Sequence, residues 1–168
     1  MTRKHEDYSR EAGGAAIGAR LRRLSERFDR ETAQIYAAQH VRFEQRWYGI
    51  LNQLVLNGPM AVGEIAAVLR VTHVSVSQAR RALEGAGLIQ ALSDGTDARR
   101  RRLALTDGGQ ALVTKLAPLW QALSDIAAEL NAEAGDLVRQ LDRLEDALNA
   151  RSLFDRVGDR VPNPQMDC

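Results

Sequence analysis

The chain has 168 residues with one cysteine, four prolines and only 5% aromatic residues. Because Cys168 has no partner, an internal disulfide is excluded. This cysteine ends a polar, proline-containing tail that we expect to be disordered, and such a tail lacks the electropositive setting of a redox-sensing thiolate. Scarce aromatics in a sequence that is 45% hydrophobic favour a helical core over a β-sandwich.

No apolar run is long enough to cross a bilayer, and no charged-then-apolar leader is present, so we expect a cytoplasmic protein without membrane contact. His5, His40 and His73 are far apart, and no cluster has the spacing of metal ligands. Acid pairs such as Glu145-Asp146 fall on a solvated helix face rather than in a cleft. The sequence therefore predicts no metal, no cofactor and no enzymatic activity.

A helix-turn-helix pattern begins at Val62. Apolar residues three and four apart predict a first helix with one buried face, formed by Ile65, Val68 and Leu69. Thr72 is placed to cap a second helix, whose inward positions are Val76, Ala79, Ala82 and Leu83. The residues left facing outward are Ser75, Ser77, Gln78, Arg80 and Arg81. Short polar groups followed by arginines suit a helix that contacts base edges and then phosphates in the major groove of DNA.

A basic hairpin follows this second helix. Residues 88–92 alternate as a short strand, residues 93–102 contain turn formers and four arginines, and residues 103–105 suit a returning strand. Seven basic and three acidic residues between positions 70 and 106 give this stretch a net charge of +4, although the whole chain carries only +1. Such concentration of positive charge is typical of a localised phosphate-binding surface.

These segments resemble the MarR family of bacterial winged helix-turn-helix regulators. The resemblance extends in element order from about Arg20 to Arg151, and its most specific part is the Asp-x-Arg wing followed by Leu-Thr-x-x-Gly. The matching runs are Val62-Gly-Glu-Ile-Ala-Ala-Val-Leu, Val74-Ser-Val-Ser-Gln, Leu83-Glu-Gly-Ala-Gly-Leu-Ile, Asp97-Ala-Arg99 and Leu105-Thr-Asp-Gly-Gly109.

The resemblance implies a mainly α fold with a small β-hairpin wing, and a homodimer that binds a pseudo-palindromic site in double-stranded DNA. It further implies a repressor that a small ligand or oxidation releases. By position, the recognition-helix residues would be Ser75, Ser77, Gln78 and Arg81, with Arg80 on phosphate. Arg99 would enter the minor groove, held by Asp97 and flanked by Arg100 and Arg101.

Three positions in this comparison stay open. Arg70 stands where helix-turn-helix turns usually have glycine, which changes the expected shape of the turn. The four consecutive arginines leave open which one enters the groove. His73, beside Thr72, either touches a phosphate or faces solvent.

The flanking helices predict a dimerisation region. Residues 19–38 carry a narrow apolar stripe, and residues 107–155 carry a longer one that starts after a capping Thr106, contains Pro118 and ends in a heptad of leucines. Residues 107–168 hold eleven acids and six bases, so we expect them to pair with a second copy of the chain rather than to touch DNA. Such a dimer would place its two recognition helices roughly 34 Å apart. A helical core within a monomer is the alternative.

We assign residues 1–18 as flexible, 39–106 as the DNA-binding domain and 156–168 as a disordered tail.

Aromatic and cationic residues gather between the first flanking helix and the DNA-binding domain. One hypothesis is an effector pocket lined by Tyr36, His40, Arg42 and Trp47, because pockets prefer such seams. The alternative, which we favour, is that Phe43, Trp47 and Tyr48 anchor the hinge.

We weigh three functions. The first is a dimeric, sequence-specific DNA-binding regulator. The second is a winged-helix protein-interaction module without DNA binding, against which the arginine-rich wing argues. The third is an enzyme or enzyme accessory, against which the lack of a convergent polar site argues.

Overall fold

The computed structural model describes residues 7–94 and 97–161, and for residues 93–94 and 97–101 it describes the backbone alone. The chain divides into two compact units, Met1–Thr114 and Lys115–Cys168. Within the described ranges, no helix is both long and apolar enough to cross a membrane.

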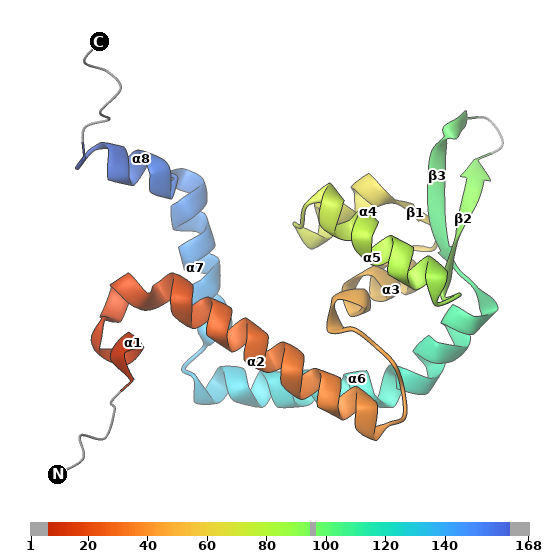
Figure 1. Ribbon diagram of the computed structural model, residues 1–168, viewed down its shortest axis with the longest axis horizontal. Helices are drawn as coiled ribbons and strands as arrows, with labels where there is room; N and C mark the ends of the chain where they lie inside the picture. Colours follow the sequence, from red (N-terminus) through yellow and green to blue (C-terminus); the bar gives the residue numbers. More distant parts are fainter. Residues whose placement is uncertain (1–6, 95–96, 162–168) are drawn as a thin grey trace. The chain divides into compact units, whose positions relative to one another are not determined.

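The first unit contains the winged helix-turn-helix motif (Figure 1). Its motif helices and hairpin confirm the fold expected from the sequence. The elements in chain order are α1 (Tyr8–Glu11), the 3-10 helix η1 (Gly13–Ala16), α2 (Ile17–Ala38), α3 (Gln45–Asn57), β1 (Met60–Ala61), α4 (Val62–Leu69), α5 (His73–Gly85), β2 (Ile89–Asp94), β3 (Asp97–Leu105) and the start of α6 (Asp107–Glu133).

The sheet has three antiparallel strands in the order β1-β3-β2. In the hairpin, Ile89 lies opposite Leu105, and the register shifts at the tip between Ser93 and Asp94. The two-residue β1 extends the sheet by pairing Met60 with Leu103. The structure confirms the predicted hairpin, but β3 begins at Asp97 rather than at Leu103. Strand β1 was not predicted from the sequence.

The core of the first unit lies where α3, α4 and α5 meet the base of the sheet. Of the predicted inward positions of α5, Val76, Ala79 and Leu83 are buried and Ala82 is half-buried. Ile65 of α4 and Leu103 of β3 are buried as well. The prediction for Val68 was wrong, because this side chain is 56% exposed. The buried face of α4 passes instead through Ile65 and Ala66, where a small residue lets α5 pack closely.

Two caps fix the helix-turn-helix. The Thr72 hydroxyl accepts the backbone N–H of Ser75 at 3.1 Å, as predicted. At the start of α4, the Glu64 carboxylate accepts the backbone N–H of Ala61 at 2.8 Å. Between the two helices, Arg70 adopts a left-handed conformation with φ of 51°. Arg70 therefore takes the backbone geometry that glycine usually supplies in this turn.

The N-terminal segment is held to α2 by an ion pair. Residues 1–6 of the segment expected to be flexible lie outside the described residues, but Tyr8–Ala16 forms helical turns that the sequence analysis did not predict. Asp7 caps α1 and also accepts two hydrogen bonds from the Arg23 guanidinium, at 3.2 and 2.8 Å. This segment is thus tied to a residue sixteen positions further along the chain.

The second unit consists of most of α6, then α7 (Leu137–Ala150) and α8 (Leu153–Gly158). Helix α6 contains Pro118 and ends before Gly135 and Asp136, which both have positive φ. The Asn131 side chain closes this turn by accepting the backbone N–H of Val138 at 2.8 Å. The leucine-rich α7 matches the predicted leucine heptad. Helix α8 lies partly in the segment expected to be disordered, of which residues 162–168 are outside the described residues.

Candidate nucleic-acid interface

Helix α5 presents a polar outer face. Ser75, Gln78 and Arg81 are exposed, as the sequence analysis expected. Val74 is also on this face and is 64% exposed, although the sequence analysis did not single it out. The spacing of 74, 78 and 81, opposite the buried positions, is the signal that would have identified it.

Four further residues of the predicted DNA-binding set make contacts within the protein. Thr72 is exposed but its hydroxyl is used as the cap of α5. His73 Nδ1 lies 3.4 Å from the Ser77 hydroxyl one turn later. Arg80 is only 27% exposed, and its Nε lies 3.7 Å from the Glu84 carboxylate. Arg81 is therefore more available to an external phosphate than Arg80 is.

The base of the wing is tied to the start of α4 by Arg102. Its Nε and one terminal nitrogen donate to the Pro59 carbonyl oxygen at 2.9 and 2.6 Å, and the same terminal nitrogen lies 3.4 Å from the Glu64 carboxylate. This guanidinium is thus committed to holding β3 beside α4. The predicted groove residues Asp97, Arg99, Arg100 and Arg101 belong to β3, and their side chains lie outside the described residues.

The end of β3, at Leu105, is fixed between the end of α5 and the start of α6. The Thr106 hydroxyl donates to the Gly87 carbonyl oxygen at 2.6 Å and accepts the backbone N–H of Gly109 at 3.0 Å. A Cβ on Gly109 would lie 2.0 Å from the Leu88 carbonyl oxygen, so only glycine fits. The Leu-Thr-x-x-Gly motif therefore seats the wing on the helix that follows it.

The hinge between α2 and α3 contains a buried aromatic cluster. Tyr36 and Phe43 have ring centroids 4.6 Å apart, and Phe43 meets Trp47 edge-on at 5.7 Å. The Tyr36 hydroxyl donates to the Gln45 side chain at 3.1 Å. These rings pack against one another, which fixes the path of the chain between the two helices.

The structure does not gather the four residues proposed for an effector pocket. Tyr36 and Trp47 are buried in the aromatic cluster, whereas His40 and Arg42 are exposed. A hollow of about 280 Å³ instead lies beside them, between α2 and the start of α3. It is lined by Asp29, Ala33, Phe43, Glu44, Gln45 and Arg46.

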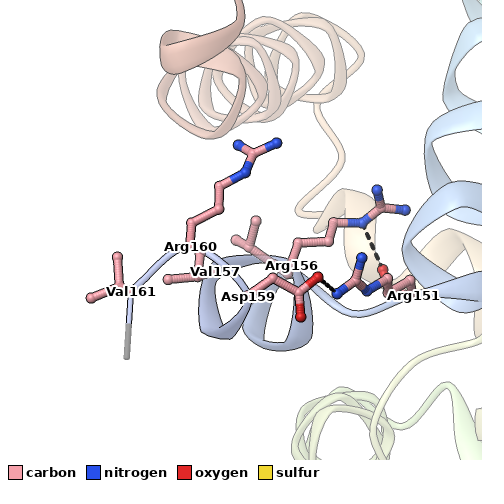
Figure 2. Close-up of a pocket in the computed structure, with 7 residues that line it drawn as sticks. Arg151, Arg156, Val157, Asp159, Arg160 and Val161 are labelled. Carbon is pink, nitrogen blue, oxygen red and sulfur yellow. Dashed lines mark hydrogen bonds and ion pairs between the residues drawn. The ribbon is translucent and has the colours of Figure 1, made fainter. Parts of the chain in front are cut away.

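A second hollow, of about 510 Å³, lies around α8 in the second unit (Figure 2). Arg156 donates to the backbone carbonyl oxygens of Arg151 and Ala147 at 3.0 and 2.6 Å, and Arg151 pairs with Asp159. Arg156 therefore satisfies carbonyl groups at the end of α7, and Arg151 pairs with the acid that follows α8. Arg160 extends away from this pair in Figure 2.

The comparisons with known proteins agree with this geometry. Residues 43–100 match the model of the MarR family. A search of curated proteins found no match.

Similar solved structures include a MarR/EmrR family transcriptional regulator from Acinetobacter sp. ADP1, with 20% identity, a TM-score of 0.66, and coverage of 86% of this chain and 99% of that one. MepR from S. aureus, in a complex with DNA, has 20% identity, a TM-score of 0.63, and coverage of 76% and 94%. BpsR from Bordetella bronchiseptica, whose DNA binding is regulated by 6-hydroxynicotinic acid, has 22% identity, a TM-score of 0.63, and coverage of 77% and 93%.

These neighbours share the winged-helix fold with long flanking helices, and the family match covers the helix-turn-helix together with most of the hairpin. The chain thus has the winged-helix fold of these MarR-family structures, and its residues 43–100 are similar to the model of that family.

Proposed function

We propose that the chain works as a homodimer that binds a pseudo-palindromic site in double-stranded DNA and represses transcription there. Helix α5 enters the major groove, and the arginines of β3 enter the adjacent minor groove. Phosphate contacts supply most of the affinity, and side chains near the start of α5 choose the site. The observation that carries this proposal is the outer face of α5, on which Ser75, Gln78 and Arg81 are exposed while the opposite face is buried.

The charge distribution supports the same proposal. The stretch from Arg70 to Thr106 carries +4, and the remainder of the chain carries −3. A protein-interaction module without DNA binding has no need for this concentration of arginine at the hairpin. The acidic residues after Thr106 favour contact with a second copy over contact with DNA.

Titration onto labelled duplex tests the proposal. The purified protein is added to DNA from upstream of its own gene, and separately to a scrambled duplex, at several salt concentrations. We expect specific binding with a steep salt dependence, and Arg81→Ala should reduce the salt slope by about one unit for each lost phosphate contact. Equal and weak binding to both duplexes would count against the proposal and in favour of the protein-interaction alternative.

We further propose that a small ligand releases the DNA by binding in the hollow between α2 and the start of α3. Phe43 supplies an apolar wall, and Asp29 and the Arg46–Glu44 ion pair, at 2.6 Å, supply polar groups. A volume of about 280 Å³ suits a molecule with a single ring. That BpsR responds to a single-ring acid supports this choice of ligand class.

Filling the hollow tests the effector proposal. A panel of single-ring aromatic acids and amines is screened for release of the specific DNA complex. Ala33→Leu should keep DNA affinity within about twofold and abolish release by the active compound, because its side chain occupies the hollow. Release that is unchanged in this variant would place the effector elsewhere.

A further inference from the structure

The exposed stripe of α5 begins with an apolar side chain. Val74 is 64% exposed at the second position of the helix, and the buried residues Val76, Ala79 and Leu83 occupy the opposite side. Positions 74, 78 and 81 are four and three apart, so at about 100° per residue they share one outward line. The helix thus presents in succession an isopropyl group, a carboxamide and a guanidinium.

This valine is held in place by the local structure. The Thr72 hydroxyl caps the first turn of α5 by accepting the Ser75 N–H, so the direction of the intervening Val74 is set. Valine also has one strongly preferred side-chain rotamer in a helix. The apolar group is therefore presented with little conformational freedom to lose on binding.

Charge complementarity identifies DNA as the occupant of this face. Gln78 and Arg81 follow Val74 along the same line, within a stretch that carries +4. A partner protein with an apolar groove would have to bury this arginine, whereas the major groove accepts it. Among base edges in the major groove, the 5-methyl group of thymine is the apolar feature.

We infer that Val74 determines sequence preference by packing against the 5-methyl group of a thymine in the major groove. The inference rests on the proposed DNA-binding function and names one of the bases recognised. Gln78 lies about 6 Å further along the helix axis, which is close to two base-pair steps. Because a glutamine side chain pairs best with adenine, the preferred site contains a thymine and an adenine about two steps apart.

Removal of single methyl groups from DNA tests the inference. Wild-type protein selects its preferred duplex from a random library, and each thymine is then replaced in turn by deoxyuridine, which lacks only the 5-methyl group. At the contacted thymine, wild-type affinity should fall about fourfold, the effect of one buried methyl group. Val74→Ala should bind the thymine duplex at least about fourfold more weakly and show no further loss on the uracil duplex.

Val68→Ala is the matched control. Val68 is 56% exposed on α4, the other helix of the motif, so this variant should keep the wild-type response to deoxyuridine. The inference about Val74 fails, and the proposed DNA-binding function stands, in either of two cases. In the first, wild-type protein selects a sequence but no deoxyuridine substitution weakens binding. In the second, Val74→Ala loses as much affinity as the wild type when thymine is replaced by deoxyuridine. If wild-type protein selects no sequence, the proposed DNA-binding function fails with it.

Discussion

At the scale of single residues, Gly109 shows how one absent side chain positions the wing. An alanine Cβ at this position would lie 2.0 Å from the Leu88 carbonyl oxygen and 3.0 Å from its carbonyl carbon. Gly109→Ala must therefore move α6 away from the start of β2, and we expect a loss of about 1–3 kcal/mol in the free energy of unfolding, measured by urea denaturation.

The neighbouring glycine supplies the control for this prediction. A Cβ on Gly108 would lie 3.4 Å from the Gly87 carbonyl oxygen, which is ordinary contact. Gly108→Ala also replaces glycine within a helix, so its stability should match or exceed the wild type by up to about 1 kcal/mol. Equal stability of the two alanine variants would contradict the steric argument.

Asp7 makes attachment of the N-terminal segment depend on pH. Hydrogen bonds from the Arg23 guanidinium, aided by Ser9, hold the pKa of Asp7 well below its usual range. Because the folded pKa is depressed, the stabilising contact is complete above the ordinary value of about 3.9 and is lost as the pH falls further. We expect NMR signals of residues 8–16 to stay unchanged from pH 8 to pH 5 and to shift toward free-peptide values below about pH 4.

Asp7→Asn removes the charge that this pH dependence requires. The variant should have a loosened N-terminal segment at pH 7 and little further change on acidification. If Asp7→Asn shows the wild-type signals at neutral pH, the ion pair with Arg23 does not hold the segment.

At the scale of secondary-structure elements, the wing depends on its anchor to α4. Arg102→Ala removes the hydrogen bonds to the Pro59 carbonyl oxygen, and we expect about 1 kcal/mol of lost stability for this half-exposed contact. Because this guanidinium contacts the protein rather than phosphate, DNA affinity should fall while the salt slope stays unchanged. Binding titrations at several salt concentrations measure both quantities.

Arg81→Ala gives the opposite pattern and serves as the comparison. It should reduce the salt slope by about one unit with no measurable loss of stability, since Arg81 is exposed on α5. If Arg102→Ala also reduces the slope by one unit, Arg102 itself contacts DNA.

The elements that sequence predicted well are those with local signals. Thr72 and Thr106 mark helix starts, and the inward periodicity of α5 needs no knowledge of distant residues. Strand β1 was missed because two residues become a strand only by pairing with β3, some forty positions later. Helices α1 and η1 were missed for a similar reason, since the segment is tied to Arg23.

The residues of the candidate interface also divide into those that the sequence predicted correctly and those that it did not. Periodicity identified Gln78 and Arg81 as outward-facing, whereas Val74 was overlooked because an apolar residue is expected to face the core. Arg80 was expected to face outward, but it turns back toward Glu84. Side-chain choices of this kind depend on neighbours that a periodic pattern does not specify.

At the scale of the whole molecule, unpaired apolar surface predicts self-association. Along α2, the side chains of Ile17, Leu21, Leu24 and Phe28 are 41–53% exposed, and α7 and α8 expose further apolar residues. Three- and four-residue spacing places those of α2 on one stripe, which is typical of a helix that packs against a partner. The residues after Thr106 carry an acidic excess, which favours contact of α7 and α8 with a second copy over contact with DNA.

Phe28→Glu tests whether this stripe of α2 joins two copies of the chain. A carboxylate there must be desolvated in a dimer but stays hydrated in a monomer, since Phe28 is 53% exposed. We expect the dimer dissociation constant, measured by analytical ultracentrifugation, to rise about thirtyfold or more, with helical content unchanged. Arg22→Gln makes the same change in net charge on the opposite side of α2 and should leave dimerisation intact. A Phe28→Glu protein that dimerises as tightly as Arg22→Gln would exclude this stripe from the dimer interface.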